Sequence, residues 1–299
     1  MRGLLATVLV VGVTSSAAAA AGPETPADAR RSVTVLHRTF VDPSRPSPAS
    51  DLQPAAPERS LETTITFPSN ATRARPLVLL AHGSNGNPYK FNQLMETWAS
   101  AGYVVVAPLF LRSSDIGGNL VGDYVEQPAD LSYVLDRVLA ANGKRRSPLH
   151  HRIDADHIGL AGLSLGGLTT YGTVFHSCCR DDRIDAAILM SAILGPFPDG
   201  VYEFSDVPTL LLHGDADNLY PQSVDAYPQL AAPKWFVTLH GGLHANPFED
   251  DRAPSDDLVR VVTTAFWDRY LEGKQGAAQR IVDAVAASAG AATLQRDAP

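Results

Sequence analysis

The sequence predicts an α/β fold in which helices cover both faces of a mostly parallel central sheet. Short apolar runs alternate along the chain with stretches whose apolar residues recur at helical spacing. Most of the runs are apolar throughout, as expected for strands that are buried on both faces of a parallel sheet. Repeated βα units bring the carboxyl ends of such strands together, so reactive groups should gather there.

The predicted elements begin with an edge strand at residues 32–36 and a strand of period two at residues 61–67. Buried strands are then expected at residues 77–81, 103–107, 157–161, 186–190, 208–212 and 234–239. Helices are expected at residues 91–101, 131–139, 167–171 and 255–270, with a weaker one at 275–287. Strands and helices therefore alternate over most of the chain.

The first 21 residues are typical of a secretory signal peptide. Arg2 precedes an apolar run from Leu4 to Val13, and small residues follow from Ala17 to Ala21. The apolar run is shorter than the ~20 residues that a membrane span needs. We therefore expect a secreted protein, extracellular or periplasmic, that is cleaved near Ala21. A cytosolic protein with an alanine-rich start is the alternative.

The remaining residues are long enough for one large domain. We expect an N-terminal extension carrying the edge strand at residues 22–60, a catalytic domain at 61–290 and a mobile tail at 291–299. The net charge is −8, and the only basic cluster, residues 144–146, is more typical of a solvated loop. Nucleic acid is therefore not an expected partner. We expect a monomer without a stable membrane span.

The two cysteines, Cys178 and Cys179, are adjacent in the chain. Consecutive Cα atoms lie ~3.8 Å apart, below the ~4.4 Å usual for a disulfide. The sequence leaves open a strained disulfide between neighbours or two buried thiols. The pair offers too few ligands for a metal site, and we expect neither a metal nor an organic cofactor.

A G-x-S-x-G segment, residues 162–166, lies between a predicted strand and a predicted helix. A tight strand-to-helix turn needs small residues on both sides of the serine, because a Cβ there would collide with the neighbouring elements. The turn would expose the Ser164 hydroxyl at a helix N-terminus, where free N–H groups can stabilise an oxyanion. An ordinary glycine-rich turn is the alternative interpretation.

A serine nucleophile needs a base, and the base needs an acid that fixes its tautomer. His244 follows the last buried strand in a loop with two glycines, and it is preferred over His240, which abuts that strand. Asp217 follows the strand at residues 208–212 and is preferred over Asp215, which resembles a turn residue. His82, His157 and His213, each at a strand end, are interpreted as structural.

Two backbone N–H groups are expected to form an oxyanion hole, those of Ser84 and Leu165. Ser84 follows the predicted strand at residues 77–81, and Leu165 directly follows the nucleophile. No long insertion that could form a lid separates residues 190 and 210, which favours an open cleft. The side chains expected to line an apolar substrate pocket are Phe110, Leu111, Tyr220 and Phe248.

These segments resemble the motifs of α/β-hydrolases. The matching residues are His82-Gly83-Ser84, Gln127-Pro128-Ala129-Asp130-Leu131, Gly162-Leu163-Ser164-Leu165-Gly166-Gly167, Cys178-Cys179-Arg180-Asp181, His213-Gly214-Asp215-Ala216-Asp217 and Gly241-Gly242-Leu243-His244. Within that superfamily the chain is similar to the secreted bacterial proteins labelled predicted dienelactone hydrolases and to platelet-activating-factor acetylhydrolases. It resembles cutinase-like polyesterases more distantly.

The resemblance implies an α/β-hydrolase fold, with Ser164 as nucleophile, Asp217 as acid and His244 as base. The chain also departs from these families. Dienelactone hydrolases use a cysteine where this chain has Ser164. Cutinases carry His and Met where it has Leu163 and Leu165, and they have a C-terminal disulfide for which it has no cysteine.

We therefore expect a secreted serine carboxylic-ester hydrolase that acts through an acyl-enzyme on small or extended esters. A polyester, cutin-type or lipid-ester hydrolase of the same mechanism is an alternative. A non-catalytic binding protein on a hydrolase fold is an alternative of another class. Such a protein would normally lack a triad member, and all three are present here.

Overall fold

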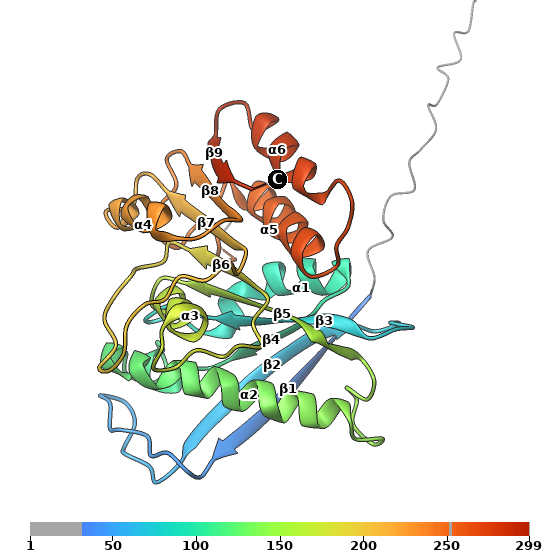
Figure 1. Cartoon of the computed structure of the whole chain (residues 1–299). Coiled ribbons are helices and arrows are strands. Elements are labelled where there is room, and N and C mark those ends of the chain that lie inside the picture. The colour runs from blue at the N-terminus through green and yellow to red at the C-terminus, as the bar shows by residue number, and fades with distance from the viewer. Residues whose placement is uncertain (1–31, 251–252, 299) are drawn as a thin grey trace, which may run out of the picture. The chain divides into compact units, whose positions relative to one another are not determined.

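The computed structural model describes residues 32–250 and 253–298, shown as a ribbon in Figure 1. The predicted signal peptide, residues 1–21, lies outside the described residues. The described chain forms one mixed sheet in the strand order β1-β2-β4-β3-β5-β6-β7-β8-β9. The strands are β1 (Val33–Asp42), β2 (Arg59–Pro68), β3 (Arg75–Ala81), β4 (Val104–Pro108), β5 (Ile153–Leu163), β6 (Ala186–Met190), β7 (Thr209–Gly214), β8 (Lys234–Leu239) and β9 (Ala292–Asp297).

The strands from β4 through β8 pair in parallel, and the pairs β1–β2, β2–β4 and β8–β9 are antiparallel. The longer helices are α1 (Asn92–Ala101), α2 (Gln127–Asn142), α3 (Leu165–Phe175), α4 (Tyr220–Ala226), α5 (Asp256–Tyr270) and α6 (Ala277–Ala286). The short 3₁₀ helices are η1 (Pro88–Phe91), η2 (Leu111–Ser113), η3 (Val121–Glu126) and η4 (Tyr227–Gln229). The predicted α/β-hydrolase fold is confirmed.

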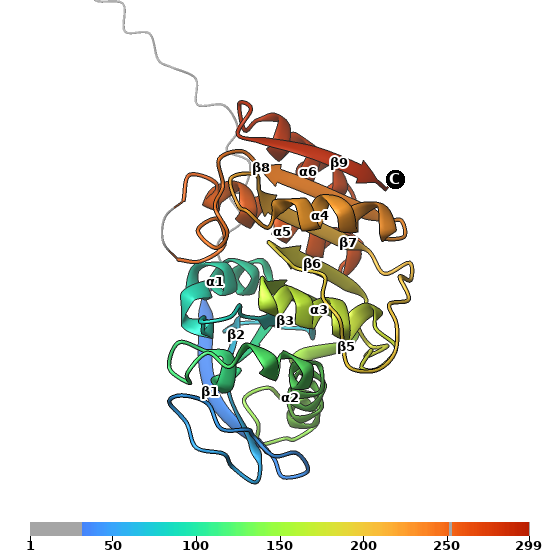
Figure 2. The ribbon, with the colours of Figure 1, turned by 90° about the vertical axis from the view of Figure 1, so that its left-hand side faces the viewer.

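The helices cover the two faces of the sheet in two groups (Figures 1 and 2). Val78 and Leu80 of β3 belong to a buried cluster with side chains of α1, α5 and α6. Leu77 and Leu79 belong to a second cluster with side chains of α2, α3 and α4. Alternate residues of a strand point to opposite faces, so an apolar run of this kind fills two cores at once.

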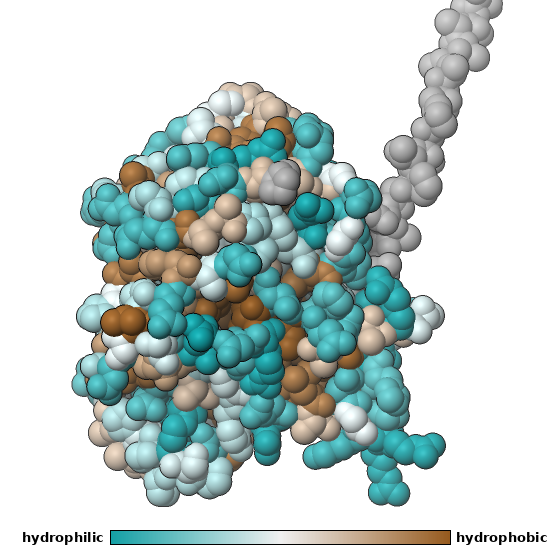
Figure 3. All heavy atoms as spheres, in the orientation of Figure 1, coloured by the Kyte–Doolittle hydropathy of each residue, from teal (hydrophilic) through white to brown (hydrophobic). Residues whose placement is uncertain are grey.

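The surface seen in the view of Figure 1 is mixed. Hydrophilic side chains cover most of this face, and apolar side chains gather in recesses toward its middle and its left side (Figure 3). Among the described residues, no helix combines the length and the apolar composition that a membrane crossing requires.

Two parts of the predicted domain organisation need correction. The expected mobile tail at residues 291–299 contains β9, which pairs with β8 over six residues. Ala292 and Leu294 of β9 pack on the core, and Arg296 lies over the Trp235 ring. The N-terminal extension also joins the sheet more extensively than expected, because β1 runs to Asp42 and pairs with β2 along its whole length.

The cysteines, which the sequence left open, form a disulfide between Cys178 and Cys179. Cys178 is exposed and Cys179 is half-buried.

Deleting residues 291–299 should destabilise the protein. The deletion removes the ladder along β8 and the packing of Leu294, which together stabilise the fold by about 2 kcal/mol, or ~4–8 °C in Tm. Thermal unfolding of the truncated chain measures the effect, with Gln295→Ala, an exposed position on the same strand, as the control. An unchanged Tm would mean that β9 contributes nothing to stability.

Candidate active site

Ser164 occupies the turn between β5 and α3 in a strained conformation, with φ 55° and ψ −114°. Such a conformation in a residue with a side chain costs of order 1–3 kcal/mol. The Ser164 N–H donates to the Met190 carbonyl at 2.9 Å, which ties the turn to β6.

The glycines on either side of Ser164 are required by close backbone approach. A Cβ on Gly162 would lie 2.1 Å from the Gly166 carbonyl oxygen. A Cβ on Gly166 would lie 2.2 Å from the Ala81 carbonyl oxygen, in β3. Because no side chain fits at either position, β3, β5 and α3 come into direct contact around the serine.

The structure brings the three predicted triad side chains together. The His244 Nε2 atom lies 2.7 Å from Ser164 Oγ, and its Nδ1 atom lies 2.5 Å from Asp217 Oδ2. The His244 side chain is 35% exposed and that of Asp217 is 6% exposed. The hydroxyl of a half-buried serine, an imidazole and a buried carboxylate therefore form one hydrogen-bonded chain.

Asp217 is an ionised acceptor. Burial raises its pKa, but hydrogen bonds from the Leu219 backbone N–H, from His244 and from His213 outweigh that effect and hold the pKa below its usual range. The Leu219 N–H lies 3.0 Å from Oδ1. His213 Nε2 lies 2.7 Å from Oδ2. The carboxylate thus keeps its charge down to acidic pH.

The two competing residues, His240 and Asp215, form a pair of their own. The His240 Nδ1 atom lies 2.7 Å from Asp215 Oδ2, and the Gly241 N–H donates to Asp215 Oδ1 at 2.7 Å. The Ala216 N–H also donates to the Gly242 carbonyl. These contacts join the loops that follow β7 and β8, which places Asp217 beside His244.

The loop that follows β3 lies against Ser164, the predicted nucleophile. A Cβ on Gly83 would lie 3.2 Å from both Ser164 Cβ and the Leu163 carbonyl oxygen. The N–H groups of the predicted oxyanion donors, Ser84 and Leu165, donate to no other group in the part of the chain that the structure describes. Both remain available for a ligand next to Ser164.

A buried histidine orients the first of these donors. His82 Nε2 accepts from the Phe110 N–H at 2.9 Å, so its Nδ1 carries the proton and donates to the Gly83 carbonyl at 2.8 Å. Burial lowers the pKa of His82 to about 4, which keeps the ring neutral. In a trans peptide the C=O and N–H point in opposite directions, so fixing the Gly83 carbonyl also fixes the Ser84 N–H.

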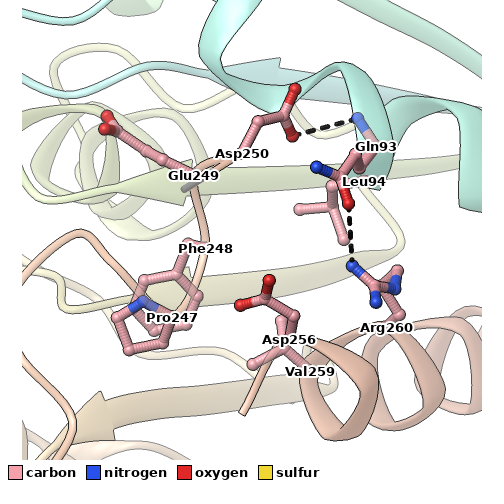
Figure 4. A pocket seen from close by; sticks show the side chains of 9 residues that line it. All are labelled: Gln93, Leu94, Pro247, Phe248, Glu249, Asp250, Asp256, Val259 and Arg260. Atoms are coloured by element: carbon pink, nitrogen blue, oxygen red, sulfur yellow. Dashed lines mark hydrogen bonds between the residues drawn. The ribbon is translucent and has the colours of Figure 1, made fainter. Parts of the chain in front are cut away.

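Two of the four predicted pocket residues, Phe110 and Phe248, are buried more deeply than an open substrate pocket requires. Both are core residues, 0% and 3% exposed. Phe248 borders a hollow with Gln93 and Arg260 on α1 and α5, and no triad residue is among the side chains that line it (Figure 4). Whether an aromatic side chain after a strand points into the core or toward the site depends on the direction in which the loop turns. The sequence pattern does not reveal that direction.

The other two predicted pocket residues also have partners elsewhere. Leu111 borders a separate hollow of about 110 Å³ beside the buried Arg59. The Tyr220 hydroxyl hydrogen-bonds Thr238 Oγ1 at 2.9 Å, and its ring packs on Phe236.

An apolar cluster that the sequence analysis missed joins the first turns of α3 to the segment between β6 and β7. Leu165, Leu168 and Phe197 form it, with Tyr124 and Ile193 packed against them. The Leu168 N–H donates to the Ser164 carbonyl at 3.0 Å, so the cluster begins directly beside Ser164. Only the spacing of Leu165 and Leu168 on a helix could have indicated it.

In the part of the chain that the structure describes, two groups of side chains have ligand atoms close enough together to hold a metal ion. They are His213, Asp217 and His244, and His176, Cys178 and Cys179. In the first group the imidazole nitrogens that point at the Asp217 carboxylate are already hydrogen-bonded to it. In the second group both sulfur atoms belong to the disulfide. Neither arrangement indicates a resident metal.

Comparisons with known proteins agree with this fold. The family model described as PET hydrolase-like matches residues 61–289. A ferulic acid esterase from Streptomyces cinnamoneus is similar in structure, with a TM-score of 0.64 and 22% sequence identity over 84% of this chain and 93% of that one. No curated protein gives a significant match.

The fold and the family define a serine ester hydrolase of the α/β-hydrolase superfamily. More specifically, the chain belongs to the PET hydrolase-like family. The relation to polyesterases, which the sequence motifs placed as the more distant one, is confirmed. The resemblance to dienelactone hydrolases stays a prediction.

Replacing Gly83 with alanine should lower kcat by ~10–100-fold, because the added Cβ displaces either Ser164 or the Ser84 amide by a few tenths of an ångström. Steady-state kinetics and thermal unfolding measure the effect. Gly143→Ala, where the added Cβ meets only an ordinary contact at the end of α2, is the control. Full activity in a folded Gly83→Ala protein would exclude this loop from the site.

Proposed function

We propose that the chain is a secreted carboxylic-ester hydrolase with Ser164, His244 and Asp217 as its catalytic triad. The observation that carries the proposal is the continuous hydrogen-bonded chain from Ser164 Oγ through both nitrogens of His244 to Asp217. A non-catalytic binding protein would have no need to maintain a strained serine at the start of a helix.

The mechanism follows from these contacts. His244 Nε2 takes the Ser164 proton as Oγ bonds to the ester carbonyl carbon. The oxyanion of the tetrahedral intermediate is stabilised by the Ser84 and Leu165 amides. His244 then returns the proton to the departing alcohol oxygen as the carbon–oxygen bond breaks, leaving an acyl-enzyme. Water, activated by the same imidazole, resolves it.

Asp217 holds His244 with Nδ1 protonated and Nε2 free to accept, and it stabilises the imidazolium that forms in each step. Because hydrogen bonds keep its pKa below the usual range, it stays ionised wherever the base is active.

The substrates we propose are esters of aromatic carboxylic acids, in solution or in a polyester. The Leu165, Leu168 and Phe197 cluster begins beside Ser164. Its members are buried, and the half-buried Tyr124 packs against them, so that apolar and aromatic side chains lie next to the proposed nucleophile. The segment from Ser191 to Pro208, between β6 and β7, packs on α3 and contains no helix that would cover Ser164.

Exposed apolar side chains also flank the proposed site. Leu243, 53% exposed, precedes His244. Ile116 is 52% exposed, and its loop is joined to the oxyanion loop by the hydrogen bond between Ser84 Oγ and Asn119. An extended substrate could rest on such side chains while one of its ester groups reaches Ser164. The family model describes PET hydrolases, and the structural relative is named a ferulic acid esterase.

Export is part of the proposal, supported by the pattern of residues 1–21. N-terminal sequencing of the protein recovered from the culture medium or the periplasm tests it. A mature chain that still begins at Met1 would contradict it.

Ser164→Ala should reduce hydrolysis of a p-nitrophenyl ester to less than ~1% of the wild-type rate, because loss of the nucleophile removes the acyl-enzyme route. The Tm should stay nearly unchanged, since alanine keeps the backbone conformation and removes only the hydroxyl that bonds to His244. Turnover of an aromatic benzoate-type ester should exceed that of a long-chain aliphatic ester. Activity retained by Ser164→Ala would refute the triad, and a preference for long aliphatic chains would refute the substrate class.

A further inference from the structure

The triad carboxylate has a second imidazole partner that the acyl-transfer scheme does not use. His213, the next-to-last residue of β7, is 0% exposed. Its Nε2 atom lies 2.7 Å from Asp217 Oδ2, the same oxygen that faces His244 Nδ1. Its other nitrogen, Nδ1, lies 2.7 Å from the hydroxyl of Ser223 on α4.

The protons in this group can be assigned from the chemistry of the partners. An ionised carboxylate only accepts, so the nitrogen of His213 that faces it must carry a proton. The ring is neutral, because burial and the adjacent His244 together lower its pKa below the ordinary histidine value despite the Asp217 charge. Nδ1 is therefore an acceptor, and the Ser223 O–H donates to it.

We propose that His213 is a positioning residue for the ester hydrolysis proposed above. It aims Asp217 at His244 by donating Nε2–H to Oδ2, while the Leu219 N–H holds Oδ1. Two fixed donors on different oxygens define the plane of the carboxylate, so Asp217 cannot rotate away when His244 becomes charged. Ser223 selects the tautomer of His213 that makes this possible.

The fold holds the His213 ring rigidly. Tyr220 packs edge-on against it, with ring centroids 5.7 Å apart, and the Tyr220 hydroxyl is tied to Thr238 on β8. Both ring nitrogens are hydrogen-bonded, so a rotation of the ring would break two buried hydrogen bonds. A side chain needed only for packing would require neither.

Two substitutions at one position separate positioning from packing. His213→Leu removes the donor, and we expect kcat to fall ~10–100-fold. KM should change by less than about twofold, because the buried His213 contacts Asp217 and acts on the reaction only through it. His213→Gln places an amide N–H close to the position of Nε2, and we expect it to restore kcat to within about fivefold of the wild type.

The pH profile gives a readout that a structural role would not move. The titratable groups facing the His213 ring are Asp217, His244 and Tyr220. Without the Nε2–H donor, the negative charge of Asp217 is compensated by one hydrogen bond fewer. The carboxylate therefore favours the protonated form of His244 more strongly. The acid limb of the kcat/KM profile should therefore move to higher pH in His213→Leu and return in His213→Gln.

Thr263→Val on α5 is the matched control. Thr263 is buried and accepts a hydrogen bond from Trp98 away from the site, so this variant should lose stability and keep both kcat and the acid limb. A folded His213→Leu protein with wild-type kcat and pH profile overturns the proposal, and so does a His213→Gln protein as impaired as His213→Leu. If Ser164→Ala is inactive while His213→Leu is normal, only this inference fails.

Nitrogen NMR of the wild-type protein tests the proton assignment without any variant. At neutral pH the proposal requires His213 to be neutral with its proton on Nε2. A neutral ring with the proton on Nδ1, or an imidazolium, overturns it.

Discussion

The site depends on the contact of three backbones at the carboxyl end of β5. Gly162 meets the Gly166 carbonyl, and Gly166 meets the Ala81 carbonyl, with no space for a side chain at either place. The chain can leave β5 and enter α3 in so short a distance only if Ser164 adopts a positive φ. Packing of the sheet and helix maintains that strain. The result is a half-buried serine beside the N–H groups of Ser84 and Leu165, which donate to nothing within residues 32–250 and 253–298.

A second set of contacts brings the acid and base to that hydroxyl. The loops after β7 and β8 are joined by the Asp215–His240 pair and by backbone hydrogen bonds. On this support, Asp217 accepts from two imidazoles that differ in exposure and role. His244 reaches the solvent and Ser164, whereas His213 is enclosed. The Asp217 carboxylate thus links the buried His213 on β7 to His244 at the carboxyl edge of the sheet.

Much of this arrangement could be predicted from the sequence, because it follows from local patterns. Apolar runs identify buried strands, and the glycines around Ser164 identify the turn. Strand β9 was not predicted because Ala292 and Leu294 alternate with polar residues over only a few positions, which is a weak strand pattern. The strand is stabilised by its pairing with β8, which a local pattern does not show. The second imidazole on Asp217 and the buried state of Phe110 depend on side-chain directions, which no local pattern specifies.

The account rests most directly on Ser164 being the nucleophile that this geometry activates. Treating the active protein with an alkyl p-nitrophenyl phosphonate and locating the adduct by mass spectrometry tests that claim. The account predicts one phosphonyl group per chain, on the peptide containing Ser164, formed in step with the loss of esterase activity. Inactivation with the adduct on another residue, or full labelling of Ser164 without loss of activity, would contradict it.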